Sequence, residues 1–244
     1  MHTTLAEAQA LVGRLLPELA ALSTVEIVLC PPFPWLTEVS RLLVGSHVLL
    51  GAQNAYFEDR GGFTGEVSPT MLGGLCQYLL VGQYERRVHF GDTLWLVNRK
   101  LLAAQRRGLK PVLCVGESAE QMEDRTGGAV VADQIESGLQ GAALGPEMVI
   151  AYDPPWTTIG KAMPPPADYA ADMCGHIRDT LASLFSRPVA DAARIIYGGS
   201  ITPRNVASIA ALPEVDGALT GAASLNAESF VTVVQAFAAA VDGQ

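Results

Sequence analysis

Seven short apolar segments, separated by longer stretches with helical spacing, constrain the fold of this chain more than any other feature. The segments are rich in β-branched residues, and polar or glycine-rich residues follow each of them, as expected of parallel strands buried on both faces of a sheet. We therefore expect seven strands, at residues 25–30, 48–52, 78–81, 112–115, 149–152, 194–197 and 218–220.

The whole chain, residues 1–244, is expected to form one domain. Its strand and helix units follow one another without a linker or a low-complexity segment, and a parallel barrel commonly uses about 250 residues. Two α/β architectures fit: a TIM (β/α)8-type parallel barrel that lacks its first strand, and an open doubly wound sheet. A helix comes first, because Thr4 and Glu7 have capping-box spacing and apolar residues then recur every three or four positions through Leu19.

Composition excludes several classes of protein. The chain is 49% hydrophobic, yet no apolar run approaches the roughly 18 residues of a membrane span, so we expect a soluble protein. A net charge of −9 argues against nucleic acid and anionic membranes as partners. The four cysteines form no metal-ligand pattern, and the opening helix does not have the sequence of a signal peptide. We expect a reduced, cytoplasmic setting and no metal.

Chemistry in parallel α/β folds lies at the carboxyl ends of the strands. Asp153 follows the strand at 149–152 and runs into Pro154-Pro155-Trp156 and a short loop at 157–160, with Lys161 after it. An acidic residue before a rigid hinge and a glycine-bearing loop predicts a catalytic base with a lid. The alternative is an aspartate that simply favours a proline turn.

Two glycine-bearing turns follow the last two predicted strands, at residues 198–200 and 220–224. In barrels, backbone N–H groups at these two positions commonly bind a phosphate. A further polar segment, Gly82-Gln83-Tyr84-Glu85-Arg86-Arg87, follows the strand at 78–81. Taken alone, this segment favours the charged start of a surface helix.

These segments resemble motifs of the triosephosphate isomerase family. Residues 149–161 resemble its active-site strand and mobile loop, residues 82–87 its Gly-His-Ser-Glu-Arg-Arg segment, and residues 197–200 and 221–225 its Tyr-Gly-Gly-Ser and Gly-Gly-Ala-Ser-Leu motifs. The resemblance implies Asp153 as the base and Gln83 as the electrophile that polarises the substrate carbonyl. It assigns the phosphate to Gly160, Ser200, Gly221 and Ala222, and supporting roles to Glu85 and Tyr197.

The chain departs from the family pattern at three of these positions. Asp153 stands where the family has glutamate, so its carboxylate lies roughly 1.5 Å farther back, and misplacement by about 1 Å can cost on the order of a hundredfold in rate. Gln83 stands where the family has histidine, so it can donate a hydrogen bond but cannot exchange a proton. Ala222 replaces a glycine and disfavours positive φ. The loop at 157–160 is one residue shorter than the family's.

Two further features follow from the resemblance. Residues 51–69 resemble the interdigitating loop of the family, with Thr64 near its tip, which predicts a homodimer through residues 54–69. The family's first strand, ending in Gly-Asn-Trp-Lys, has no counterpart before Met1, and both a real loss and a misassigned start remain open. Without that lysine, Glu85 is expected to be a buried carboxylate that lacks its partner.

The resemblance implies an aldose–ketose isomerase of a small phosphorylated sugar, acting through an enediolate and needing no cofactor. Two alternatives stay open. One is an isomerase of a larger sugar phosphate, such as a tetrose phosphate, since Tyr84, Ala222 and the shortened loop would surround the substrate. The other is a repurposed or catalytically inactive phosphate-binding barrel, because function depends on the site and not on the fold.

Overall fold

The protein is described from a computed structural model that covers residues 1–145, 147–157 and 167–243. The described residues form one seven-stranded sheet, whose strands follow in sequence order. The strands are β1 (Val28–Leu29), β2 (Leu49–Ala52), β3 (Tyr78–Val81), β4 (Lys110–Val115), β5 (Val149–Tyr152), β6 (Arg194–Tyr197) and β7 (Gly217–Ala218).

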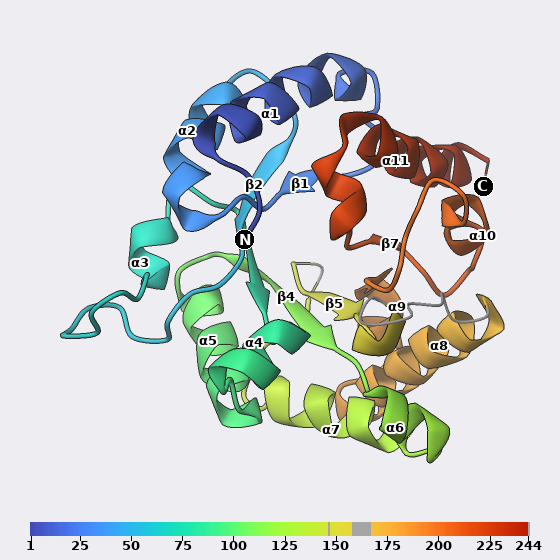
Figure 1. Cartoon of the computed structure of the whole chain (residues 1–244). Coiled ribbons are helices and arrows are strands. Elements are labelled where there is room, and N and C mark those ends of the chain that lie inside the picture. Colours follow the sequence, from blue (N-terminus) through green and yellow to red (C-terminus); the bar gives the residue numbers. More distant parts are fainter. Residues whose placement is uncertain (146, 158–166, 244) are drawn as a thin grey trace.

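Every neighbouring pair of strands is parallel, and the sheet curls with helices around its outside (Figure 1). A doubly wound sheet reverses its strand order at a switch point, whereas here the order runs from β1 to β7 without reversal. The fold is therefore an α/β barrel of the TIM type. Within the described residues, β1 and β7 each pair with a single neighbour.

The strands at the two ends of the sheet are shorter than the sequence predicts. The stretch 25–30 is reduced to Val28–Leu29, and the stretch 218–220 gives way to Gly217–Ala218. Each of these strands has hydrogen bonds to one neighbour only, so fewer bonds keep its ends extended. The predicted bounds of β3, β5 and β6, which have neighbours on both sides, are confirmed.

The helices connect the strands and cover the sheet. The opening helix is confirmed with its capping box: Glu7 N donates to Thr4 Oγ1 at 3.4 Å, and Thr4 N donates to the Glu7 carboxylate at 2.6 Å. The α-helices are α1 (Leu5–Leu19), α2 (Leu36–Leu42), α3 (Pro69–Leu72), α4 (Tyr84–Phe90), α5 (Leu94–Arg106), α6 (Ala119–Glu123), α7 (Gly127–Gly138), α8 (Ala167–Leu184), α9 (Arg187–Ala192), α10 (Val206–Ala210) and α11 (Ala227–Asp242). The 3-10 helices are η1 (Phe33–Trp35), η2 (Pro155–Thr157) and η3 (Ala222–Leu225).

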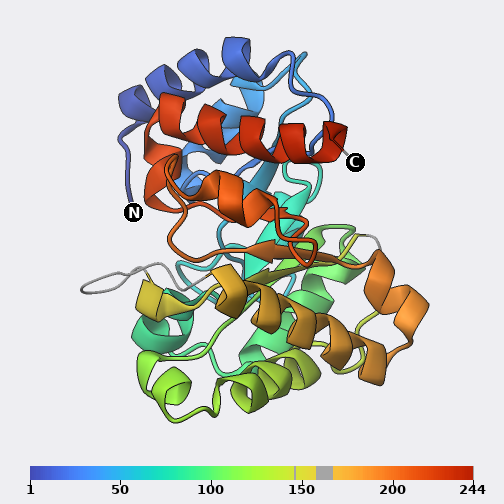
Figure 2. The same cartoon turned by 90° about the vertical axis from the view of Figure 1, so that its right-hand side faces the viewer.

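The first and last helices, α1 and α11, lie side by side (Figure 2). One apolar cluster runs between the helices and the strands, from Val12 to Phe237. A smaller cluster fills the inside of the sheet and includes Tyr78, Leu80 and Cys114. No helix among the described residues is long and apolar enough to cross a membrane.

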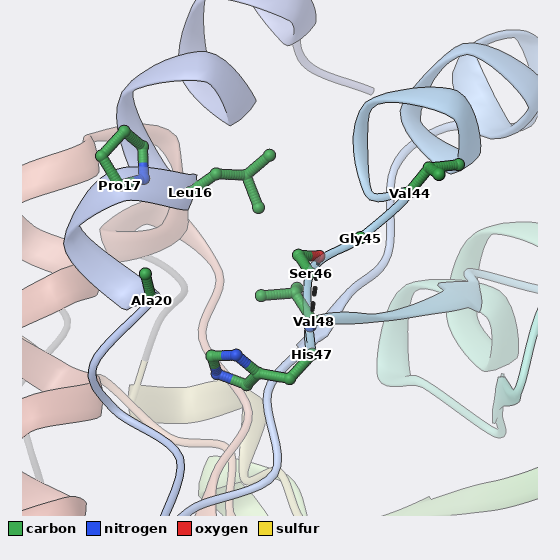
Figure 3. Close-up of a pocket in the computed structure, with 8 residues that line it drawn as sticks. All are labelled: Leu16, Pro17, Ala20, Val44, Gly45, Ser46, His47 and Val48. Atoms are coloured by element: carbon green, nitrogen blue, oxygen red, sulfur yellow. Dashed lines mark hydrogen bonds between the residues drawn. The ribbon is translucent and has the colours of Figure 1, made fainter.

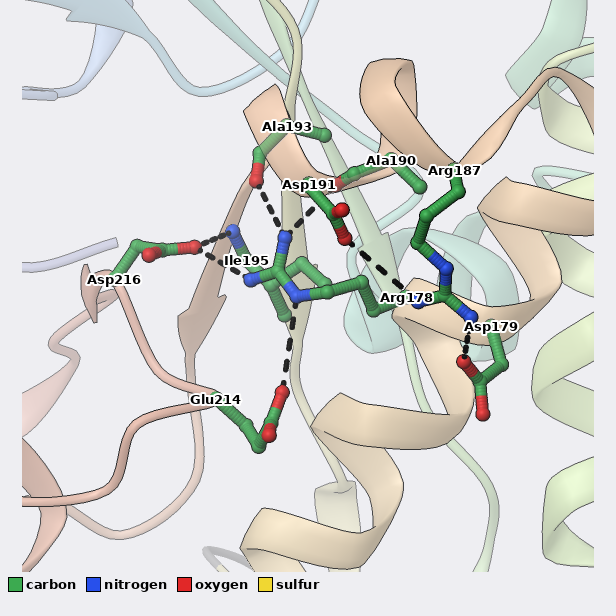
Figure 4. Close-up of polar contacts among 9 residues, drawn as sticks. All are labelled: Arg178, Asp179, Arg187, Ala190, Asp191, Ala193, Ile195, Glu214 and Asp216. Carbon is green, nitrogen blue, oxygen red and sulfur yellow. Dashed lines mark hydrogen bonds and ion pairs between the residues drawn. The ribbon is translucent and has the colours of Figure 1, made fainter.

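Arg178 of α8 ties the amino ends of β6 and β7 together (Figure 4). Its guanidinium donates to the carbonyls of Ala190 and Ala193 at 2.8 and 3.0 Å, and to Asp216 at 3.0 Å. Asp216 also accepts a hydrogen bond from Ile195 N at 2.8 Å. The side chain of Arg178 is only 13% exposed, so these partners compensate for the lost hydration of its charge.

A hollow of about 380 Å³ lies at the same amino end of the sheet, between the end of α1 and the segment that leads into β2 (Figure 3). Its lining residues are Leu16, Pro17, Ala20, Val44, Gly45, Ser46, His47 and Val48. The hollow is therefore at the opposite end of the strands from the residues that the sequence assigned to chemistry.

Replacing Arg178 should destabilise the fold far more than replacing a neighbouring exposed arginine. Arg178→Met is expected to lower the free energy of unfolding by about 2 to 4 kcal/mol, because it removes three hydrogen bonds, leaves the Ala193 carbonyl without this donor and takes the buried cation away from Asp216. Arg187→Met is the control: its ion pairs are more than half exposed, and such pairs contribute about 0.5 kcal/mol. Urea denaturation measures both, and equal losses would contradict this role of Arg178.

Candidate active site

The predicted chemical residues lie at one rim of the barrel. Asp153 follows β5, Gln83 follows β3, Ser200 follows β6 and Gly221 follows β7, and these are the carboxyl ends of the parallel strands. β6 lies between β5 and β7 and pairs with both. Tyr152 of β5 is paired to Tyr197 of β6, and Tyr197 is paired to Ala218 of β7. Gly160 and Lys161 lie outside the described residues.

Asp153 is held between two glycines on the neighbouring strands. Its backbone N donates to the Val115 carbonyl at 2.7 Å. A Cβ atom on Gly116 would lie 2.4 Å from the Asp153 carbonyl oxygen, and one on Gly198 would lie 3.0 Å from the Asp153 Cβ. The carboxylate itself has no hydrogen bond or ion pair within the described residues, which leaves it free to accept a proton.

The surroundings of Asp153 make it a stronger base than an ordinary aspartate. Burial and the nearby negative charge of Glu85 raise the pKa of the carboxyl, the guanidinium of Arg87 opposes them, and the net result is a pKa of about 7. Arg87 is held by a hydrogen bond to the Gly116 carbonyl at 3.4 Å. The charge of Asp153 also contributes to the raised pKa of the Cys114 thiol and of the Tyr197 hydroxyl. A base with a pKa near the working pH is suited to proton abstraction.

Gln83 stands at the start of α4, with its side chain free. The preceding Gly82 has φ +80°, and a Cβ there would lie 3.1 Å from the Cys114 carbonyl, so glycine allows α4 to begin close to β4. The Gln83 carbonyl accepts a hydrogen bond from Arg87 N, while its side-chain amide bonds to nothing within the described residues.

The expectation that Glu85 is a buried carboxylate is wrong. Glu85 lies in the first turn of α4 and is exposed. Water therefore solvates its charge, and the helix N-terminus favours a negative charge at this position. It needs no buried cationic partner.

Glu117, which follows β4 after Gly116, organises the hinge that follows Asp153. Its side chain is fully buried, and its Oε1 accepts hydrogen bonds from the Tyr152 hydroxyl (2.9 Å), Trp156 Nε1 (2.9 Å) and the Tyr169 hydroxyl (3.1 Å). The rings of Trp156 and Tyr169 also meet edge to face at 5.8 Å. One carboxylate oxygen thus joins β5, the hinge and α8. The other oxygen, Oε2, has no partner within the described residues.

The turn at 198–200 is packed tightly against Tyr197. A Cβ atom on Gly199 would lie 2.0 Å from the Tyr197 hydroxyl oxygen, so only glycine fits there. The Tyr197 ring is fully buried, and its hydroxyl has no hydrogen-bond partner within the described residues. Ser200 N donates to Thr157 Oγ1 at 3.2 Å, which connects this turn to the hinge.

The turn after β7 accepts alanine without backbone strain. Ala222 is exposed and begins η3, and the described non-glycine residues with positive φ are Thr3 and Arg125. The Cβ of Ala222 therefore imposes none of the backbone cost that the sequence comparison suggested. Gly221 is also exposed, and its carbonyl accepts hydrogen bonds from Ser224.

Sequence reasoning gave no role to three residues that shape this rim: Arg87, Glu117 and Thr157. Glu117 could have been found, because it is a carboxylate that closely follows an apolar strand, at the end where catalytic residues concentrate. Arg87 contacts Gly116 and Thr157 contacts Ser200, and these partners are distant in sequence. No local sequence pattern predicts such contacts. The described residues contain no cluster of acidic, histidine and cysteine side chains suited to a metal ion.

The fold and its rim define an α/β-barrel protein whose chemistry-bearing residues meet at the carboxyl ends of the strands. The chain belongs to the triosephosphate isomerase family, whose family model matches residues 1–237. It is 44% identical to triosephosphate isomerase of Carboxydothermus hydrogenoformans, over 96% of this chain and 94% of the relative. It is 43% identical to the enzyme of Moorella thermoacetica, over 96% and 94%.

A solved structure supports the same assignment. The crystal structure of triosephosphate isomerase from Bartonella henselae superimposes with a TM-score of 0.86 at 31% sequence identity, and covers 97% of this chain and 95% of that one. The family resemblance and the barrel fold expected from the sequence are confirmed.

The raised pKa of Asp153 should make the folded protein less stable as the pH rises. An unfolded aspartate has a pKa of about 4, so between about pH 4 and 7 the unfolded chain binds fewer protons than the folded one and stability is lost. The stability of wild type relative to Asp153→Asn should fall by about 2 to 3 kcal/mol between pH 5 and pH 8. Urea denaturation at both pH values measures this.

The exposed Asp172 provides the control, because Asp172→Asn should leave the difference between the two pH values unchanged. Arg87→Met should raise the pKa of Asp153 above about 7, since it removes the cation that opposes burial. Carbon-13 NMR titration of the carboxyl would detect this, and a downward shift would contradict the account.

Proposed function

We propose that the protein is an aldose–ketose isomerase of triose phosphates. One observation carries the proposal: the Asp153 carboxylate, which has no partner among the described residues and a pKa of about 7, lies at the same rim as two glycine-bearing turns. An isomerase of this kind needs a base for a carbon-bound proton and a site for the phosphate. The family membership of the chain and its identity to named triosephosphate isomerases agree with it.

In this proposal Asp153 takes a proton from the carbon next to the carbonyl and returns it to the neighbouring carbon. The side-chain amide of Gln83 donates a hydrogen bond to the oxygen that gains charge in the enediolate. Because an amide cannot exchange that proton, Gln83 stabilises the intermediate without moving protons between its oxygens. That transfer falls to the Asp153 carboxyl: its acid form protonates one oxygen, the carboxylate then takes the proton from the other oxygen, and this proton is delivered to the neighbouring carbon. The amides of Ser200, Gly221 and Ala222, together with Gly160, hold the phosphate, and Tyr197 supports the turn before Ser200.

Exchange of substrate hydrogen with solvent tests the role of Asp153. In D2O the wild type should incorporate deuterium at carbon in dihydroxyacetone phosphate, and Asp153→Asn should lower that rate by on the order of a hundredfold or more, because the base is lost. Mass spectrometry of the recovered substrate measures the label. No incorporation by wild type would contradict the proposal, and faster turnover of tetrose phosphates would move it to a larger substrate.

The double variant Gln83→His, Asp153→Glu separates a weak isomerase from a repurposed barrel. If the scaffold is competent, restoring both side chains should raise turnover by on the order of a hundredfold. An inactive wild type and an inactive double variant together would favour a barrel that binds phosphate without isomerising it.

We also propose that the protein is a homodimer through the loop at 54–69. Figure 1 supports this, because the loop before α3 extends away from the barrel. Large apolar side chains are exposed on and beside it: Phe63 is 42%, Met71 67% and Trp95 61% exposed. Ring contacts from Tyr56 to Phe63 and from Phe57 to Trp95 connect the loop to α5. Exposed large apolar side chains on one segment are typical of an interface between subunits.

Met71→Glu should convert the dimer to monomer, because it would bury a carboxylate in an apolar interface and weaken association by on the order of a hundredfold. Val44→Glu is the control, since Val44 is 83% exposed at the opposite end of the barrel. Sedimentation velocity measures the state of each protein. A monomeric wild type, or an unchanged Met71→Glu dimer, would contradict the interface.

We further propose a cytoplasmic location and one domain over the whole chain. All four cysteines are free, and burial raises the pKa of the Cys30 and Cys174 thiols to about 12, which keeps them unreactive. The apolar cluster that joins α1 to α11 supports the single domain.

A further inference from the structure

The amide of Ser200 already has a hydrogen-bond partner inside the protein. Ser200 N donates to Thr157 Oγ1 at 3.2 Å, and this hydroxyl donates in turn to the Pro154 carbonyl at 2.8 Å. The Thr157 side chain is fully buried, so the Ser200 N–H points into the protein and not into solvent. One of the amides assigned to the phosphate is therefore occupied by a neutral side chain.

We propose that the Thr157 hydroxyl competes with the substrate phosphate for the Ser200 amide and thereby sets the affinity of the phosphate site. The inference rests on the proposed function, since it concerns the same phosphate site. A phosphate oxygen is charged, and charge-assisted hydrogen bonds are roughly twice as strong as neutral ones. The phosphate therefore displaces the Thr157 hydroxyl from the Ser200 amide. Its affinity is lower than that of a free amide would allow, because the hydrogen bond between Ser200 and Thr157 has to break first.

The surrounding backbone allows the amide to change partners. Gly198 and Gly199 precede Ser200. Gly198 N is fixed by a hydrogen bond to the Tyr152 carbonyl at 2.7 Å, so the change of angle falls on Gly199, where glycine permits backbone angles that other residues do not. After the amide the chain is fixed: the Ser200 carbonyl accepts a hydrogen bond from Asn205 Nδ2 at 2.8 Å, and Asn205 Oδ1 accepts one from Thr202 N at 2.7 Å. The amide can thus turn while the following segment stays in place.

Thr157 also lies at the end of the hinge that begins at Asp153. When phosphate takes the Ser200 amide, the hydrogen bond between the hinge and the turn after β6 is lost; the hydrogen bond of Trp156 to Glu117 is a separate contact of the hinge. The Thr157 hydroxyl keeps its bond to the Pro154 carbonyl, which also accepts from Thr157 N at 3.2 Å. Occupation of the phosphate site is in this way connected to the segment that carries the base.

Thr157→Val tests the proposal, because valine keeps the shape of threonine and removes only the hydroxyl. In this variant the Ser200 amide has no internal partner, so inorganic phosphate should bind about two- to tenfold more tightly than to wild type, the equivalent of one neutral hydrogen bond. Thr157→Ser is the matched control, since serine keeps the hydroxyl and should bind phosphate as wild type does. Titration of protein labelled with 15N-serine gives the dissociation constants and reports the Ser200 amide directly.

Each outcome decides the question. If phosphate binds more tightly to Thr157→Val than to wild type and Thr157→Ser, and the Ser200 amide resonance moves during the titration, the competition is supported. Equal affinities for wild type and Thr157→Val, with the Ser200 resonance moving, overturn the inference but leave the proposed phosphate site standing. Absence of phosphate binding in all three proteins overturns both. Thr157→Ala replaces Thr157→Val if the valine variant fails to fold, with the same expected direction.

Discussion

Parallel pairing of every strand with its sequence neighbour is the constraint on which the rest of the structure depends. In a parallel sheet all carboxyl ends reach the same rim, and here the pairing runs unbroken from β1 to β7. Residues 83, 117, 153, 200 and 221, spread over more than half the chain, therefore meet at one end of the barrel. Contacts such as those of Arg178 lie at the opposite rim and hold the amino ends of the strands together. The rim at the carboxyl ends is thus left to the candidate active-site residues.

The site combines one carboxylate that is fixed and one that is free. Glu117 is buried and its Oε1 accepts three hydrogen bonds, so it holds the hinge through Trp156. The Asp153 carboxylate has no hydrogen bond or ion pair to any described residue, and burial raises its pKa instead. Burial of a carboxyl group thus has two different effects. Where hydrogen-bond donors surround the carboxylate, as at Glu117, it holds neighbouring segments in place; where they do not, as at Asp153, burial raises the pKa and makes the group a stronger base.

Much of this arrangement could be predicted from the sequence, and the failures have physical causes. The bounds of β3, β5 and β6 followed from apolar patterning because neighbours on both sides keep those strands extended. The bounds of β1 and β7 did not follow from this pattern. Each of these strands has a hydrogen-bonded neighbour on one side only among the described residues, so the extended segment is displaced or shorter than its apolar composition predicts. The prediction that Glu85 is buried was wrong, because an acidic residue at the start of a helix can point toward the core or toward solvent. The packing of α4 decides this, and it leaves Glu85 exposed.

The sequence by itself determined the family, the alternation of strands and helices, and the positions of Gln83, Asp153 and Ser200 at strand ends, because each of these depends on local order along the chain. The tertiary structure decided which charges surround Asp153, which donors reach Glu117 and which acceptor holds the Ser200 amide. Those facts depend on distances between residues far apart in sequence, and folding alone sets such distances. Asp153 is a base or a turn residue according to the space around it, and that space is built by other strands.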